Sequence, residues 1–101
     1  MKRTIDKLRS QVRDQKYLIS IHANQEMSDD QLSAVDVENA ILTGKIVKRL
    51  TKDQRGTRYE VVGHACDDRS IAIVCRLLQS GWLTIITVYA LDETNDETRP
   101  V

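Results

Sequence analysis

Residues 69–78, RSIAIVCRLL, and residues 82–91, WLTIITVYAL, decide the fold of this chain. The second run is apolar on both faces apart from Thr84 and Thr87, a pattern typical of strands inside a sheet. Ser80-Gly81 between the runs favours a turn. The two runs therefore predict neighbouring antiparallel strands near the middle of a sheet.

Two further strands are predicted upstream of this pair. Residues 46–50 form a short half-exposed run, and residues 58–66 place apolar side chains on alternate positions. The polar connection 51–57 is suited to a hairpin loop, and Asp67-Asp68 to a turn. Four consecutive strands with short connections form an antiparallel meander.

The N-terminal part of the chain predicts helices. Ile5, Leu8 and Val12 form one apolar stripe, so residues 4–15 are expected to be an amphipathic helix. Residues 17–21 are a short β-prone run, and residues 22–27 favour a helical turn.

A second helix is predicted to end at Gly44. Ser28 and Gln31 fit a capping box, which places its start at Ser28. Gly44 then suits a left-handed stop. A second box, Ser33 to Asp36, leaves open a later start after a turn.

These elements predict a two-layer α+β domain, with an antiparallel four-stranded meander sheet and two helices on one face. The chain has 101 residues, which suits a single domain. We expect this domain to span residues 1–91 and residues 92–101 to form an acidic flexible tail.

The balance of charge conceals a segregated pattern. Lys+Arg and Asp+Glu both number 15, which argues against a uniformly basic nucleic-acid binder. Residues 17–44 carry five acidic side chains and no basic one, whereas residues 45–58 carry six basic side chains and Asp53. We call these the acidic segment and the basic segment. Their opposite charge predicts where charged partners dock.

Composition also indicates the class of protein. No apolar run is long enough to cross a membrane, and the N-terminus lacks the apolar stretch of a secretory signal. Cys66 and Cys75 then suggest a reducing, cytoplasmic setting, with both thiols buried as small apolar groups. Trp82 is expected in the core.

An ordered set of short motifs resembles domain-of-unknown-function family 4258, small proteins related in fold to RelE/BrnT-type toxins. The resemblance covers residues 17–91 and implies a RelE-like fold, an RNA-cleaving ancestry and an antitoxin-like protein partner. The set comprises Ser20-Ile21-His22-Ala23, Met27, Leu32, Val37-Glu38, Ala40-Ile41, Gly44-Lys45-Ile46, Gly56, Arg58-Tyr59, Val61, Gly63, Asp68-Arg69, Ile71, Ile73-Val74 and Ile85-Ile86-Thr87-Val88-Tyr89.

The chain departs from the family pattern at two positions. The pattern runs His-Ala-x-x-Arg-Met-x-x-Arg-x-Ile, whereas this chain has Glu26 and Asp30 in place of the two arginines. Arginine can clamp a phosphate, and a carboxylate repels it. The departure favours a non-catalytic interaction domain over a ribonuclease.

Metal-independent RNA cleavage needs groups that move a proton and cations that hold the phosphate. Residues of suitable type predict a catalytic set: His22, Arg58, His64, Arg69 and Tyr89. Each also has a structural explanation. His22 would fix the corner between strand and helix, His64 would be an ordinary sheet residue, and Arg69 would pair with Asp67 or Asp68.

The basic segment predicts a surface for RNA or an acidic partner, made of Lys45, Lys48, Arg49, Lys52 and Arg55. Lysines on an edge strand also prevent aggregation, which is the structural explanation of the same residues. Complementary acidic and basic segments favour a homodimer as well.

No cofactor is expected, because the chain has no glycine-rich phosphate loop and no nucleophile elbow. No metal is expected either, because His64 and Cys66 lack the close Cys/His pairs of zinc sites. The sequence thus predicts an interaction domain that pairs with protein through charged faces, with a toxin-like ribonuclease as the alternative.

Overall fold

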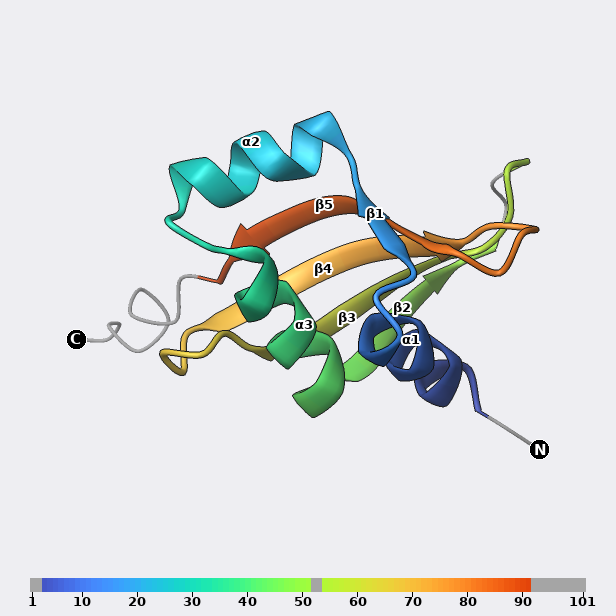
Figure 1. The fold of residues 1–101 in the computed structure, drawn as a ribbon, viewed down its shortest axis with the longest axis horizontal. Helices are drawn as coiled ribbons and strands as arrows, with labels where there is room; N and C mark the ends of the chain where they lie inside the picture. Colours follow the sequence, from blue (N-terminus) through green and yellow to red (C-terminus); the bar gives the residue numbers. More distant parts are fainter. Residues whose placement is uncertain (1–2, 52–53, 92–101) are drawn as a thin grey trace.

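The computed structural model of the protein describes residues 3–51 and 54–91. Figure 1 shows α1 and α3 in front of the sheet, and α2 along the side formed by β5. The domain is therefore α+β, as the sequence predicts. The elements are α1 (Thr4–Arg13), β1 (Tyr17–Ile19), α2 (Ile21–Asp29), α3 (Ala34–Thr43), β2 (Lys45–Leu50), β3 (Arg58–His64), β4 (Ser70–Leu77) and β5 (Leu83–Ala90).

The sheet within these residues has five strands in the order β1-β5-β4-β3-β2. Strands β2 to β5 form the predicted antiparallel meander, with β4 and β5 inside the sheet. The prediction of four strands and two helices is wrong in detail. The described chain has a fifth strand, β1, and a third helix, α2.

Strand β1 pairs with β5 in parallel, with Tyr17 opposite Leu83 and Ile19 opposite Ile85. The first and last of the described strands are thus neighbours, and every other described element except α1 lies between them in sequence. A three-residue strand carries too few side chains to indicate its partner. This pairing makes the sheet mixed.

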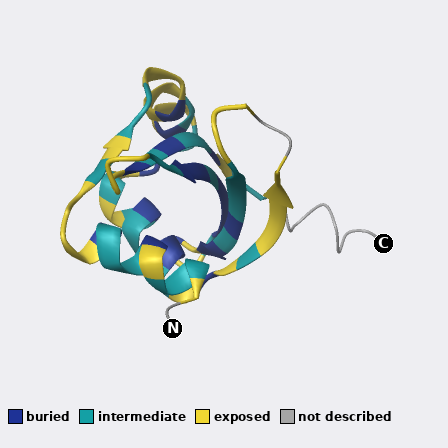
Figure 2. Ribbon diagram, turned by 90° about the vertical axis from the view of Figure 1, so that its right-hand side faces the viewer, coloured by how far each residue is buried: buried dark blue, intermediate teal, exposed yellow. Residues whose placement is uncertain are grey.

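The core lies between the sheet and the helices. Leu8 and Val12 of α1, and Val37 and Ile41 of α3, are buried against alternate residues of the strands. Figure 2 colours the buried stretches dark blue, and they face the interior that the curved sheet and the helices enclose. The predicted stripe of α1 is confirmed, although the helix ends at Arg13 rather than at residue 15.

The helix starts differ from the first prediction. Ser28 lies in the last turn of α2, and the capping box at Ser33 and Asp36 opens α3 instead. A separate cap begins α2, where the Ser20 hydroxyl accepts a hydrogen bond from the Ala23 N–H at 3.0 Å. The alternative later start is therefore correct.

Gly44 ends α3 in an extended conformation, with φ −95° and ψ −171°, so the predicted left-handed stop is wrong. Glycine is needed there for space. A Cβ at Gly44 would lie 2.3 Å from the Val62 carbonyl oxygen, and one at Gly63 would lie 2.0 Å from that of Ala40. The two glycines let α3 pack directly on β3.

Two predicted core residues lie at the surface. Trp82 is 38% exposed at the turn before β5, and Cys66 is exposed in the loop after β3. Cys75 is buried as predicted. Both exceptions sit just outside a strand, where strand alternation no longer dictates burial. The predicted tail, 92–101, lies outside the described residues.

Candidate functional site

Strand β2 forms one edge of the sheet, since β3 is its only neighbour in the described chain. Five of its six residues are exposed, and Figure 2 shows such positions in yellow. Val47 is 49% exposed and Leu50 is 38% exposed. An edge strand presents unpaired N–H and C=O groups, so β2 is able to accept another strand.

The basic side chains of β2 divide between its two faces. Lys45 pairs with Val62 and Lys48 with Glu60. Because Val62 and Glu60 alternate with the buried residues of β3, both lysines lie on the sheet face away from the helices. The register shift between Ile46 and Lys48 keeps them on that face.

The opposite face of β2 carries Ile46 and Arg49. Ile46 pairs with the buried Val61, and Arg49 pairs with Tyr59. The Arg49 guanidinium carbon lies 5.7 Å from the centre of the Tyr59 ring, a cation–π contact. Arg49 therefore faces the α1 side, away from the two lysines.

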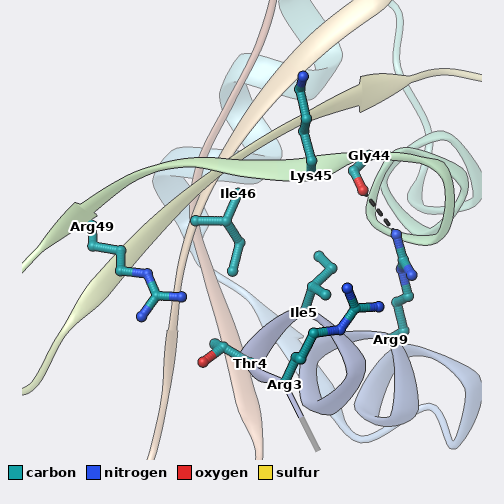
Figure 3. A pocket seen from close by; sticks show the side chains of 8 residues that line it. All are labelled: Arg3, Thr4, Ile5, Arg9, Gly44, Lys45, Ile46 and Arg49. Carbon is teal, nitrogen blue, oxygen red and sulfur yellow. Dashed lines mark hydrogen bonds between the residues drawn. The ribbon is translucent and has the colours of Figure 1, made fainter.

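A pocket of about 450 Å³ lies between this face of β2 and the start of α1. Figure 3 shows the side chain of Lys45 pointing away from it and those of Ile46 and Arg49 pointing toward α1. The lining residues are Arg3, Thr4, Ile5, Arg9, Gly44, Lys45, Ile46 and Arg49.

The acidic segment binds groups within the fold. Glu26 Oε1 accepts the Val88 N–H and Asp30 Oδ2 accepts the Ala90 N–H, both at 3.0 Å. These amides lie on the side of β5 beyond the end of β1. Glu26 and Asp30 thus satisfy β5 where it has no strand beside it. A guanidinium has no acceptor and could not do so.

Two more carboxylates join helices to distant parts of the chain. Asp36 Oδ1 accepts the Cys66 N–H at 2.9 Å, and its Oδ2 accepts the Ser33 N–H at 2.8 Å. These bonds lower the pKa of Asp36. Glu38 accepts a hydrogen bond from the Tyr17 hydroxyl, and burial together with this bond raises the pKa of Tyr17 to about 12.

The predicted catalytic residues on β3 lie at its two ends. Arg58 and His64 bound the strand on the face away from the helices, so six residue steps separate them. At ~3.3 Å per step their backbones are about 20 Å apart, too far for both to meet one phosphate group. The structure brings Tyr89 to Glu60 instead, with its hydroxyl donating to Oε2 at 3.1 Å.

Burial and the Glu60 bond raise the pKa of Tyr89, so its hydroxyl is protonated at neutral pH. His22 is exposed in the first turn of α2, with Nε2 3.3 Å from Glu26 Oε2. A protonated phenol and this imidazole–carboxylate pair could move protons. The carboxylates beside both groups would repel an incoming phosphate.

Arg69 is held in the loop between β3 and β4. Its Nε lies 2.9 Å from Asp67 Oδ2, and its terminal nitrogens donate to the carbonyls of Asp30 and Gln31. The predicted pairing with Asp67 is confirmed. The guanidinium joins the end of α2 to this loop, so a phosphate would have to displace several bonds.

The remaining predicted surface residues fall beyond β2. Arg55 is exposed in the connection to β3, and Lys52 lies outside the described residues. Within residues 3–51 and 54–91 no group of three or more His, Cys, Asp or Glu side chains is arranged to hold a metal. None of the helices described there has the length and apolarity that crossing a membrane requires.

Sequence reasoning did not assign Arg3 and Arg9 to a site, although both belong to a basic N-terminal stretch. Arg9 donates to the carbonyls of Ile41 and Gly44, at 3.3 and 2.9 Å, and so fixes α1 to the end of α3. Asp6 lies 3.3 Å from Arg3, and this neighbour lowers the pKa of Asp6. Only the tertiary placement of α1 beside β2 shows that these arginines share a pocket.

A family described as a domain of unknown function (DUF4258) matches residues 19–90. The chain belongs to this family. The match includes β2, α2 and α3 and begins after α1, so the pocket has one wall inside the family domain and one outside it. No curated protein and no solved structure matches the chain.

Proposed function

We propose that this DUF4258 domain is a protein-interaction module that binds an acidic, extended segment of a partner along β2. The observation that carries the proposal is the state of β2, a six-residue edge strand with three basic side chains, no acidic one and five exposed positions. An added strand would gain main-chain hydrogen bonds along this edge. Its side chains would then meet those of β2.

The charge of β2 favours an acidic partner over a second copy of the same strand. Lys45 and Lys48 would face an added strand on one side of the sheet, and Arg49 would face it on the other. Two β2 strands paired together would bring like charges opposite one another, which is destabilising. Glutamate or aspartate on alternate positions of the partner would instead be attracted.

The acidic segment of a second copy is poorly suited to be that partner. Its carboxylates at Glu26, Asp30 and Asp36 accept backbone N–H groups of their own fold. A homodimer through the two charged segments would have to compete with these bonds. An acidic protein of antitoxin type, which the sequence resemblance implies, is the partner class we favour.

The RelE/BrnT-type ribonuclease stays a prediction, as does RNA as a ligand of the basic residues. The separation of Arg58 from His64 and the internal bonds of Arg69 do not favour catalysis. An RNA-cleavage assay with the purified protein is its direct test, with Tyr89→Phe and His22→Ala as variants.

The interaction is tested with a fluorescent peptide of alternating Glu and Val residues and the full-length protein. We expect binding, with amide shifts in nuclear magnetic resonance spectra that follow β2. The double variant Lys45→Glu/Lys48→Glu should weaken binding at least about tenfold at low salt. Arg13→Glu/Lys16→Glu makes the same charge change at exposed positions away from β2 and is the matched control.

Amide shifts along β2 that appear with the Glu–Val peptide and are absent with a Lys–Val peptide would support the proposal. Equal losses in the two double variants would show a general charge effect and refute it. Binding of the peptide elsewhere on the sheet would refute it as well. A dimer in analytical ultracentrifugation that Lys45→Glu/Lys48→Glu dissociates would favour self-association instead.

A further inference from the structure

The pocket between α1 and β2 carries several positive charges around an apolar centre. Arg3 and Arg9 come from the α1 side and Arg49 from β2, while Ile5 and Ile46 lie between them (Figure 3). None of the eight lining residues is acidic. The pocket is therefore suited to an anion that also has an apolar part.

The three guanidinium groups differ in how strongly the fold holds them. Arg9 is held by its hydrogen bonds to the carbonyls of Ile41 and Gly44. It therefore lines the pocket and adds a positive charge at a fixed position. Arg49 is exposed and lies over the Tyr59 ring, and Arg3 meets Asp6 through Nε alone. Figure 3 shows the groups of Arg3 and Arg49 on opposite sides of the two isoleucines.

The shape and chemistry indicate the class of ligand. A planar guanidinium matches the oxygens of a phosphate group better than it matches a spherical anion. The volume of about 450 Å³ is within the range of pockets that hold small molecules. Ile5 and Ile46 would then contact the part of the ligand that carries no charge.

We propose that this pocket binds a small phosphate monoester with an apolar or aromatic group, its phosphate bound by Arg49 at the rim and its uncharged part against Ile5 and Ile46. This site differs from the peptide surface, because Lys45 and Lys48 lie on the other face of β2. It also depends on α1, which lies outside the family match. One wall of the ligand site is thus formed by residues that the family match does not cover.

The test uses phenyl phosphate and the full-length protein, with calorimetry for affinity and phosphorus nuclear magnetic resonance for the bound group. Inorganic phosphate lacks the apolar ring and phenol lacks the phosphate group. Both should therefore bind more weakly than phenyl phosphate. Arg49→Ala should weaken phenyl phosphate at least about tenfold, because a charge-assisted hydrogen bond is lost. Arg13→Ala, at an exposed position in the last turn of α1, is the matched control.

Thr4→Glu provides a second variant that should keep the fold. An acidic residue in the first turn of a helix is favourable, so α1 should remain intact. Its carboxylate would stand beside the arginines and repel the phosphate. We expect phenyl phosphate binding to be lost while the thermal unfolding curve is unchanged or shifted upward.

Wild-type affinity in both Arg49→Ala and Thr4→Glu would overturn the proposal, and so would an equal loss in Arg13→Ala. Failure here leaves the peptide proposal standing, because that proposal is tested at Lys45 and Lys48 and shares only Arg49 with the guanidinium groups of the pocket. Lys48→Glu, at a residue that does not line the pocket, should weaken peptide binding and leave phenyl phosphate binding within about threefold.

Discussion

In the acidic segment, four carboxylates accept hydrogen bonds from groups elsewhere in the fold, whereas the basic side chains of β2 lie exposed at a sheet edge. The two segments have charges of similar size and opposite sign. Their roles differ because backbone N–H groups left over by the fold need acceptors, and only carboxylates among charged side chains can accept. Net charge by segment therefore does not reveal which charges are available to a partner.

The contact between α3, in the acidic segment, and β3, the strand beside β2, should be the most sensitive place in the molecule. Gly63→Ala would set a Cβ 2.0 Å from the Ala40 carbonyl oxygen and force α3 away from β3. We expect a loss of more than about 3 kcal/mol in the free energy of unfolding, measured by urea denaturation. Gly81→Ala, where no atom lies within 4 Å and the cost is that of a positive φ alone, should lose less.

Replacing the carboxylates of Glu26 and Asp30 by arginine tests the comparison directly. Glu26→Arg/Asp30→Arg removes the acceptors of the Val88 and Ala90 N–H groups. We expect the free energy of unfolding to fall by about 2 kcal/mol or more, and hydrogen exchange at those two amides to accelerate. Unchanged exchange at Val88 and Ala90 would show that the carboxylates do not support β5.

Asp36→Asn should cost about 1 kcal/mol at neutral pH, because an amide has one acceptor oxygen and cannot serve both the Ser33 and the Cys66 N–H groups. The pKa of Asp36 is lowered from 3.8, so its carboxylate adds stability above that pH. This contribution is lost as pH falls through the lower, folded-state pKa. Urea unfolding across acid pH should show the two proteins converging.

Tyr17 offers a spectroscopic check on the Glu38 contact. Its pKa of about 12 lies above the ordinary value of 10.0, so the neutral phenol stabilises the fold below pH 10 and this contribution is lost as pH rises toward 12. Ultraviolet absorbance should show a tyrosine titration near pH 12 that is missing in Tyr17→Phe. Glu38→Gln should move it to lower pH, and a titration that stays in place would contradict the assigned cause.

The basic edge should show the smallest effect on stability. Lys45→Ser/Lys48→Ser should change the free energy of unfolding by no more than about 0.5 kcal/mol, since both side chains are exposed. Light scattering should nevertheless reveal more aggregation, because lysine protects an edge strand. A large loss of stability in this variant would show that the lysines of β2 support the fold as the carboxylates of the acidic segment do, and would contradict the comparison.

The local sequence pattern predicted the positions of the strands well, but it predicted less well which strands pair in the sheet. The runs that became β4 and β5 are long, apolar and separated by a turn, so their pairing followed from the chain itself. The partner of β1 did not, because its contact with β5 joins residues at opposite ends of the domain. The choice between Ser28 and Ser33 was decided by the Asp36–Cys66 bond, across 30 residues of chain.

The candidate site could also be predicted from the sequence only in part. The basic residues of the edge strand stand out in the sequence, and Lys45, Lys48 and Arg49 were found in this way. The division of these side chains between two faces depends on the register shift near Val47, which no sequence pattern marked. The pocket required α1 to lie beside β2, which the bonds of Arg9 to the end of α3 establish.

The carboxylates of Glu26 and Asp30 have a consequence for assembly. They occupy β5 along the stretch where β1 no longer covers it, and β1 itself has only three residues. Among the described residues, the six-residue β2 is therefore the longer open edge of the sheet. A strand added there completes the sheet, so we expect complexes of fixed stoichiometry rather than chains of domains joined edge to edge.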